Sequence, residues 1–376
     1  MVSDSDSDSD LVIVNHPITY IIGSGVSAYT VAVRLLSRNK PVHLLTLADL
    51  TAQASAGAGG LWMPFHAGGE ENSATVELYS KWAKATFDEY EMNNRNAARS
   101  AFLPTDKSVV EMVEVNSYSS ETESPYWASI TSDFEIVDDS HRSREYCRKT
   151  KFTAPIIDCP AALIHYEQTC RLSSLCTITQ VEEKFNDAAA VVDFINSSFE
   201  NGAESNDFTV VNCAGASGHL LSGGTDNSEN FVARGILHLY EREKCNDKAA
   251  LYDSGSHTNG ENYPTYCIPR GNVVVVGGCY IKNDFETTIR ANEAEFLTKN
   301  TKLLLGETKT GKKLAEWVGW RPCRAAGVRV EHDRELSELL GVSFIHNYGH
   351  GGSGWTLCSG SADAVVEIIE NLHLIS

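Results

Sequence analysis

The segment between residues 18 and 47 constrains the fold of this chain more than any other. An apolar run at 18–22 is typical of a short strand, and it leads directly into the glycine-rich stretch 23–28. A helical pattern of apolar residues follows, and 42–47 forms a second apolar run. This order predicts a β-α-β unit, in which the right-handed crossover makes the two strands parallel neighbours.

The glycine-rich stretch has the form G-x-G-x-x-A, which is typical of dinucleotide binding. Gly23 permits a tight turn, Gly25 lets the backbone approach a pyrophosphate, and the small Ala28 lets the helix pack closely on the strand. The first N–H groups of the helix then offer a partial positive charge to the phosphates. The pattern predicts a cofactor site without distinguishing NAD from FAD. Its other expected cofactor contacts are Ser24, Val26 and Ser27.

An acidic residue about 20 residues after such a motif can bind the ribose hydroxyls of the cofactor. Asp49 has this spacing and is the candidate. The alternative is that Asp49 caps or turns a loop.

The rest of the chain alternates helical and strand-like segments at both ends and is more β-like in the middle. A helix is expected over 71–95, with Val76, Leu78, Trp82 and Phe87 on one face. Further helices are expected at 159–172, 189–194 and 362–369, and strands at 209–213, 271–278 and 343–348. This order predicts an α/β fold with a discontinuous nucleotide-binding domain and an inserted second domain.

Composition and charge exclude several classes of protein. The 376 residues carry 31 Lys and Arg against 50 Asp and Glu, and the net charge of −19 disfavours nucleic acid as a partner. No apolar run reaches the ~20 residues of a membrane-spanning helix. The ten cysteines include no C-x-x-C pair, so we expect buried free thiols and no metal site. Four Ser-Asp repeats at 3–10 predict a mobile acidic tail rather than a signal peptide.

Five further motifs follow the glycine-rich turn, namely GGLWMPF at 59–65, NCAG at 212–215, YCIP at 266–269, GWRPCR at 319–324 and HNYGHGGSGWT at 346–356. With residues 23–28, the series resembles the D-amino-acid oxidase and D-aspartate oxidase family of FAD enzymes, from about residue 18 to residue 369. The resemblance implies FAD as the cofactor and a discontinuous Rossmann-type FAD-binding domain with an inserted β-rich substrate-binding domain. The implied bounds are 15–62, 150–230 and 327–376 for the first domain, 63–149 and 231–326 for the second, and 1–14 for the disordered acidic tail.

The same resemblance implies a set of FAD contacts. Gly60 and Leu61 would present backbone to the flavin ring, Ser55 would supply a hydroxyl to the pyrophosphate, and Val181 would meet the adenine. Gly215 would let the chain pass close to the cofactor. Backbone N–H groups of the segment 351–356 would stabilise negative charge on the pyrimidine end of the flavin. The residues of that segment are Gly351, Gly352, Ser353, Gly354, Trp355 and Thr356.

The implied reaction is oxidative deamination. An amino acid with a neutral amine would pass a hydride from its α-carbon to flavin N5, the imino acid would hydrolyse to a 2-oxo acid and ammonia, and oxygen would be reduced to hydrogen peroxide. Such chemistry needs a clamp on the α-carboxylate. Arg321 is the candidate, because a guanidinium forks onto a carboxylate with two hydrogen bonds. Tyr266 would complete the clamp, and the carbonyl of Gly352 would accept from the amine.

Side-chain preference stays open at this point. Tyr280 matches a tyrosine that fungal members carry, whereas mammalian D-aspartate oxidases place an arginine there. An acidic substrate needs a second cation for its distal carboxylate, and the candidates are His66, Arg270 and Lys282. The loop 244–262, rich in Asp, Gly, Ser and Asn, offers no clear substrate lid.

Other functions compete with this interpretation. They are a related flavin amine oxidase acting on glycine or another small amine, an NAD-dependent dehydrogenase, and a non-catalytic flavin-binding protein. The expected partners are a small amino acid, molecular oxygen and a second copy of the chain. Family members are usually peroxisomal, yet Leu374-Ile375-Ser376 is not a Ser-Lys-Leu type signal, so the cytoplasm is the alternative.

Overall fold

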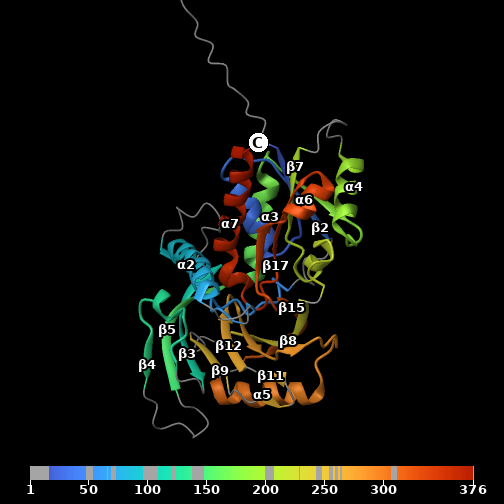
Figure 1. Cartoon of the computed structure of the whole chain (residues 1–376). Coiled ribbons are helices and arrows are strands. Elements are labelled where there is room, and N and C mark those ends of the chain that lie inside the picture. The colour runs from blue at the N-terminus through green and yellow to red at the C-terminus, as the bar shows by residue number, and fades with distance from the viewer. Residues whose placement is uncertain are drawn as a thin grey trace, which may run out of the picture.

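The computed structural model of this chain contains two large β-sheets (Figure 1). A cavity lies between them. It describes residues 17–47, 54–65, 67–68, 73–95, 109–119, 123–137, 148–199, 207–227, 229–242, 248–253, 257–258, 261–262, 265–305 and 311–375. Within these residues, no helix is both long and apolar enough to cross a membrane.

The first sheet has six strands in the order β16-β17-β7-β1-β2-β6. Its strands are β1 (Ile18–Ile22), β2 (Val42–Leu47), β6 (Cys176–Val181), β7 (Phe208–Asn212), β16 (Arg329–His332) and β17 (Ser343–Tyr348). β1 pairs in parallel with β2 and with β7, and only β16 runs antiparallel to its neighbour. The predicted β-α-β unit with parallel neighbouring strands is therefore confirmed.

Helices cover both faces of this six-stranded sheet (Figure 1). Ile21, Leu44 and Val211 pack in one apolar cluster with α1 (Val26–Leu36), α3 (Cys159–Leu172) and α7 (Gly354–Ile375). The alternate residues Tyr20, Leu45 and Val210 pack in a second cluster with α4 (Ala188–Ser198) and α6 (Arg334–Leu340). Because side chains alternate between the faces of a strand, apolar residues at every position produce a three-layer core.

The second sheet has nine strands in the order β14-β8-β13-β12-β9-β3-β5-β4, with β15 also paired to β8. Its strands are β3 (Val110–Ser119), β4 (Glu135–Val137), β5 (Arg148–Ile157), β8 (Asn230–Glu241), β9 (Ala249–Asp253), β12 (Thr265–Arg270), β13 (Val273–Gly277), β14 (Ile281–Lys282) and β15 (Lys313–Arg324). All pairs are antiparallel except β3 with β9. α5 (Ala291–Leu305) covers its outer face, and β10 (His257–Thr258) and β11 (Glu261–Asn262) form a separate two-stranded pair (Figure 1).

α2 (Ser73–Arg95) confirms the expected helix, but one of the four residues predicted for its buried face falls outside that face. Trp82 and Phe87 are buried as expected, whereas Leu78 is 41% exposed. The buried side chains recur every three or four residues from Tyr79 to Tyr90, and Leu78 falls outside that stripe. The stripe packs on α7, where a Cβ added at Gly360 would lie 2.3 Å from the Cα of Trp82.

Two segments group differently from the predicted domain bounds. β5 begins at Arg148 and was expected to lie largely in the FAD-binding domain, but it pairs with β3 along its whole length in the second sheet. α2 was expected in the substrate-binding domain, but its buried stripe packs on α7 beside the first sheet. In both cases long-range pairing decides the grouping, and no local pattern reports it. The predicted tail 1–14 lies outside the described residues.

Candidate active site

A cavity of about 730 Å³ lies where the carboxyl ends of β1, β2 and β7 face the inner side of the second sheet. Ligands of open α/β sheets bind at this edge of the strands. The turn after β1 is shaped by Gly23, whose φ of +135° favours glycine. A Cβ at Gly23 would lie 2.4 Å from the carbonyl oxygen of Cys213, so only glycine lets the two strand ends meet here.

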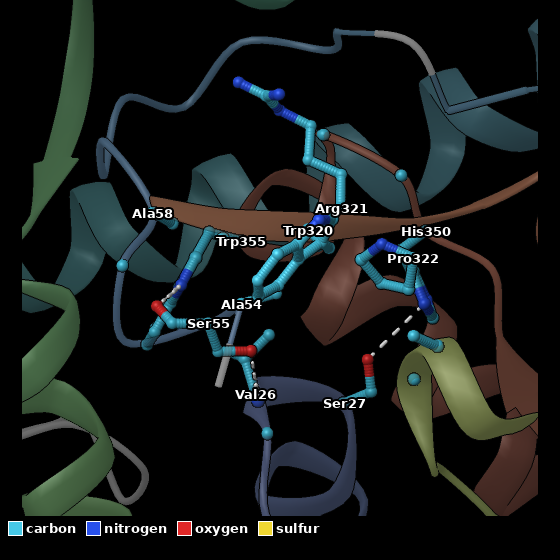
Figure 2. Close-up of a pocket in the computed structure, with 18 of the residues that line it drawn as sticks. Val26, Ser27, Ala54, Ser55, Ala58, Trp320, Arg321, Pro322, His350 and Trp355 are labelled. Atoms are coloured by element: carbon cyan, nitrogen blue, oxygen red, sulfur yellow. Dashed lines mark hydrogen bonds between the residues drawn. The ribbon is translucent and has the colours of Figure 1, made fainter. Parts of the chain in front are cut away.

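The first helix N-terminus at the cavity belongs to α1. Gly25 caps it without a side-chain hydrogen bond. The N–H of Val26 donates to Ser55 Oγ at 3.1 Å, and Ser27 Oγ lies 3.4 Å from His350 Nδ1 (Figure 2). Because Ser55 accepts through its oxygen, its own proton can be donated to an anion held in front of the helix.

The second helix N-terminus at the cavity belongs to α7, which begins at Gly354. The N–H of Gly351, whose φ is +56°, donates to the carbonyl of Pro322 at 2.8 Å. Trp355 Nε1 donates to the carbonyl of Ser55 at 2.9 Å (Figure 2). The dipoles of α1 and α7 therefore both direct partial positive charge into one cavity.

Most of the predicted cofactor residues line this cavity. They are Gly23, Ser24, Gly25, Val26, Ser27, Ser55, Gly60, Leu61, Val181, Gly215, Gly351, Gly352, Gly354 and Trp355. A Cβ added at Gly215 would meet no protein atom within 4 Å, so this residue borders open space. Asp49 and His66 lie outside the described residues.

Ser353 and Thr356 are not among the lining residues and instead hold the chain at 63–65. Ser353 Oγ accepts from the N–H of Phe65 at 2.8 Å and donates to its carbonyl at 3.0 Å. Thr356 Oγ1 accepts from the N–H of Met63 at 3.2 Å and donates to its carbonyl at 3.1 Å. The two hydroxyls thereby fix the segment that carries Phe65 into the cavity.

Arg321 and Tyr266 lie together on the inner side of the second sheet. Nη1 of Arg321 donates to the carbonyl oxygens of Arg234 at 3.2 Å and Cys279 at 2.9 Å. Both protons of that nitrogen are thus used, which leaves the Nη2 and Nε edge of the guanidinium for a carboxylate. Tyr266 also lines the cavity, and the positive charge of Arg321 acts on its hydroxyl. Burial raises the pKa of Tyr266 despite the opposing charge of Arg321, so Tyr266 is a neutral donor near neutral pH.

Tyr280 lies beside Arg321 and is not among the described residues that line the cavity. Its hydroxyl is 3.6 Å from Cys323 Sγ, and its ring centroid is 5.7 Å from Arg321 Cζ. The ring of Phe65 meets it edge to face, with centroids 6.2 Å apart. This geometry makes Tyr280 a platform under the guanidinium, where its ring attracts the cation.

The candidates for a second cation occupy other places. Arg270 is buried and its Nη1 donates to the carbonyl of Ala58, in the loop that leads to Gly60. Lys282 is exposed and its Nζ lies 4.1 Å from the ring centroid of Phe231. Neither residue lines the cavity.

Charged side chains are few among the described residues that line the cavity. They are Glu183 and Lys184, which follow Val181 at the end of β6, and Arg321. His350 also lines the cavity, but burial lowers its pKa to about 4, so its imidazole is neutral at neutral pH. Figure 2 shows Arg321 far from Val26 and Ser27 of the α1 turn. Arg321 is therefore the cation available, in the described structure, at the end away from the α1 turn.

Phe65 and Trp317 are two of the lining residues that the sequence reasoning missed. A Cβ at Gly352 would lie 2.8 Å from Phe65 Cδ1, so the Phe65 ring stands directly over Gly352. Trp317 lies against Gly57 and Gly319, where an added Cβ would come within 2.0 Å and 1.9 Å of its ring. Phe65 ends the motif at 59–65 and Trp317 precedes the one at 319–324, but no local signal says that their rings face the cavity.

These features fit an extended dinucleotide such as FAD. Two helix N-termini suit its anionic groups, Gly215 leaves open space beside it, and apolar residues line much of the cavity between the two ends. Nothing in the donor set requires a metal, and no cluster of metal-ligating side chains occurs among the described residues.

Comparison with known proteins gives a consistent result. The model of the DAO family, described as FAD dependent oxidoreductase, matches residues 19–368. The chain is 28% identical over 353 residues to the D-amino-acid oxidase of Rubrobacter xylanophilus, covering 91% of this chain and 93% of that protein. It is 30% identical over 164 residues to D-aspartate oxidase 1 of Caenorhabditis elegans, covering 43% of this chain and 45% of that protein.

The fold has solved counterparts as well. The glycine oxidase of Bacillus cereus ATCC 14579 superposes with a TM-score of 0.68 at 15% identity, covering 94% of this chain and 97% of that one. At this identity the similarity shows the shared fold alone. Taken with the match over residues 19–368, these findings show that the chain belongs to the DAO family of FAD-dependent oxidoreductases, with FAD as its cofactor.

Proposed function

We propose that this protein oxidatively deaminates D-amino acids to 2-oxo acids and ammonia, with oxygen reduced to hydrogen peroxide. The observation that carries the proposal is the clamp, in which Arg321 is anchored by one nitrogen and keeps its other edge for a ligand. A free α-carboxylate is the group that such a fork binds best. Proteins named D-amino-acid oxidase that align over more than nine-tenths of the chain support this substrate class.

FAD, when bound, supplies the two-electron acceptor for the reaction. The chain itself supplies position and a dry, charged setting. Arg321 holds the carboxylate through Nη2 and Nε, and the neutral hydroxyl of Tyr266 donates to the same group. The carbonyl of Gly352 accepts from the amine of the substrate. Phe65 and other apolar lining residues exclude water from the cavity. The N-terminus of α7 stabilises negative charge that lies in front of that helix.

We further propose that uncharged side chains are preferred over acidic ones. Neither Arg270 nor Lys282 reaches the cavity, so the described structure offers no second cation at the substrate end. An acidic side chain would then enter an apolar site without a counter-charge, which is costly. His66 lies outside the described residues and is the remaining candidate for such a charge.

The test is peroxide release by the purified, FAD-loaded protein over D-alanine, D-methionine, D-aspartate, D-glutamate and glycine, with L-enantiomers as controls. We expect turnover of D-alanine and D-methionine, weaker turnover of the acidic pair, and none of the L-enantiomers. Preference for D-aspartate would contradict the side-chain proposal alone. Turnover confined to glycine would replace the proposal with a glycine oxidase, and no peroxide from any of them would refute the amino-acid oxidase. Peroxisomal location and homo-oligomerisation stay predictions of the family resemblance.

A further inference from the structure

A buried carboxylate sits outside the cavity, at a junction of three chain segments. Asp226 is 2% exposed and lies in the turn that follows the 3₁₀-helix η2 (Gly215–Leu221). Nε of Arg324 donates to both of its oxygens, at 2.9 Å and 2.7 Å, and the hydroxyl of Tyr348 donates to Oδ2. Burying a carboxylate is tolerated only with such complete pairing.

The three members come from the segments that build the active site. Arg324 ends β15, three residues after Arg321. Tyr348 ends β17, three residues before Gly351 of the loop that leads into α7. Asp226 follows Gly215, which borders the cavity. The Asp226 carboxylate thus links β15, which carries Arg321, to the loop at 349–354. Asp226 itself lies in the segment that follows Gly215.

Backbone contacts carry this link to the cavity. The N–H of Gly351 donates to the carbonyl of Pro322 at 2.8 Å, and Cys323 forms an isolated antiparallel bridge with His350. The residues after Arg321 are therefore attached directly to the loop that faces the cofactor. A shift of Arg324 relative to Tyr348 would change the distance between the clamp and that loop.

Charges around Asp226 favour its ionised form. Burial raises its pKa, but hydrogen bonds from Arg324 and Tyr348 and the charge of Arg329 outweigh burial, so the pKa of Asp226 lies below its ordinary value. Nη1 of Arg329 also reaches the hydroxyls of Tyr348 and Thr225, each at 3.4 Å. The cluster is charged and mutually satisfied at neutral pH.

We infer that Asp226 is a positioning residue, which through Arg324 and Tyr348 sets the spacing between the Arg321 clamp and the cofactor loop at 349–354. The part of this inference that concerns the substrate rests on the proposed function, and the part that concerns FAD does not. A displacement near 1 Å in such a site is enough to reduce turnover markedly.

The test replaces Asp226 by Asn, which keeps the shape and removes the charge. We expect the Kd for FAD, measured by flavin fluorescence, to rise about tenfold, and the KM for the best amino acid to rise about tenfold while kcat falls by a smaller factor. Asp226→Glu, which restores the charge on a longer arm, should recover part of both effects.

A matched control comes from a second buried arginine pair. Arg34, at the other end of α1 from the cavity, is paired with Glu89 of α2 and with Asp363. Glu89→Gln is the same carboxylate-to-amide change beside a buried guanidinium. It should lower the Tm by a similar amount and leave the Kd for FAD and the KM within about twofold of wild type.

The outcomes separate the two roles. Asp226→Asn with a lower Tm but an unchanged Kd and KM would overturn the inference, because the cluster would then be structural only. If that variant does not fold, Tyr348→Phe, which removes the hydroxyl that donates to Asp226 and accepts from Arg329, must still raise the Kd for FAD or the inference fails. If the wild-type protein oxidises no amino acid, the proposed function is refuted. The Kd for FAD of Asp226→Asn, compared with wild type, still tests the inference.

Discussion

The two sheets differ in how their strands are buried. In the six-stranded sheet, all five residues of β7 are buried and so are five of the six in β2. In the nine-stranded sheet, β3 alternates irregularly between buried and half-buried residues, and β15 is exposed over its first four. A parallel sheet covered by helices on both sides needs apolar residues throughout, whereas one face of the second sheet borders a cavity and solvent.

The half built on the six-stranded sheet and the half built on the nine-stranded sheet therefore have different roles. The six-stranded half offers backbone, glycines and helix N-termini to the cofactor, beside the charged side chains of Glu183 and Lys184. The nine-stranded half offers the side chains of Arg321 and Tyr266, which only cross-strand pairing brings together. Changes in the first half should therefore act on FAD binding and stability, and changes in the second on substrate.

The largest effect that would test this division is expected from Arg321→Ala. The change removes the carboxylate fork, so kcat/KM should fall by about 10³-fold while the Kd for FAD stays within about twofold. Arg321→Lys keeps the positive charge but not the forked pair of donors, so its kcat/KM should lie between those of wild type and Arg321→Ala. Arg242→Ala, at an arginine that pairs with Glu111 at the far end of the same sheet, is the control and should behave like wild type. Steady-state kinetics and fluorescence titration measure both quantities, and FAD loss in Arg321→Ala would contradict the division.

A smaller effect is expected at the glycines of the first half. Gly215 and Gly224 both have positive φ, +57° and +86°, and a Cβ at either would meet no protein atom within 4 Å. Replacing either by Ala therefore costs a similar backbone strain. Only Gly215 lines the cavity, so Gly215→Ala should raise the Kd for FAD by about tenfold or more and Gly224→Ala should not. Equal dissociation constants in the two variants would place the cofactor elsewhere.

The smallest effect concerns acid stability of the first half. Burial lowers the pKa of His43, His346 and His350 from 6.5 to about 4. Their folded pKa lies below the unfolded value, so the unfolded chain binds more protons, and stability is full above pH 6.5 and lost as the pH falls toward 4. His43→Gln should reduce the slope of unfolding free energy against pH in this window by about 1.4 kcal/mol per pH unit. Denaturant unfolding at several pH values measures the slope, and an unchanged slope would show that His43 is not buried in its neutral form.

Sequence reasoning predicted the first half better than the second. Strands β1, β2, β7 and β17 and helices α1, α3 and α7 follow from continuous apolar runs, turn residues and helical periodicity. The long strands β8 and β15 and the helix α5 were not anticipated, because their residues mix polar and apolar types without a strict period. The place of β5 in the second sheet and the buried stripe of α2 also depend on partners far away in the sequence.

The candidate site shows the same limit. The residue types and motifs pointed to Arg321, Tyr266 and the glycine loops, and the structure brings them to one cavity. Tyr280 does not line the cavity, its hydroxyl lies near Cys323 and its ring lies beside Arg321, and its role toward a substrate stays a prediction. Arg270 was a candidate cation for a substrate, but it binds the carbonyl of Ala58. Side-chain direction on a strand depends on the register with its neighbours, which a single sequence does not report.

The sequence by itself determined the glycine-rich turn at 23–28, because a turn between a strand and a helix depends on residues that are neighbours in the chain. The order of its motifs also predicted Arg321 and Tyr266 as the candidate carboxylate clamp. Only the tertiary structure decided that Nη1 of Arg321 is anchored to two backbone carbonyls and that Asp226 joins Arg324 to Tyr348. These arrangements depend on hydrogen bonds between residues 42 to 122 positions apart, and the free energy of burying a charge selects them only when all partners are present.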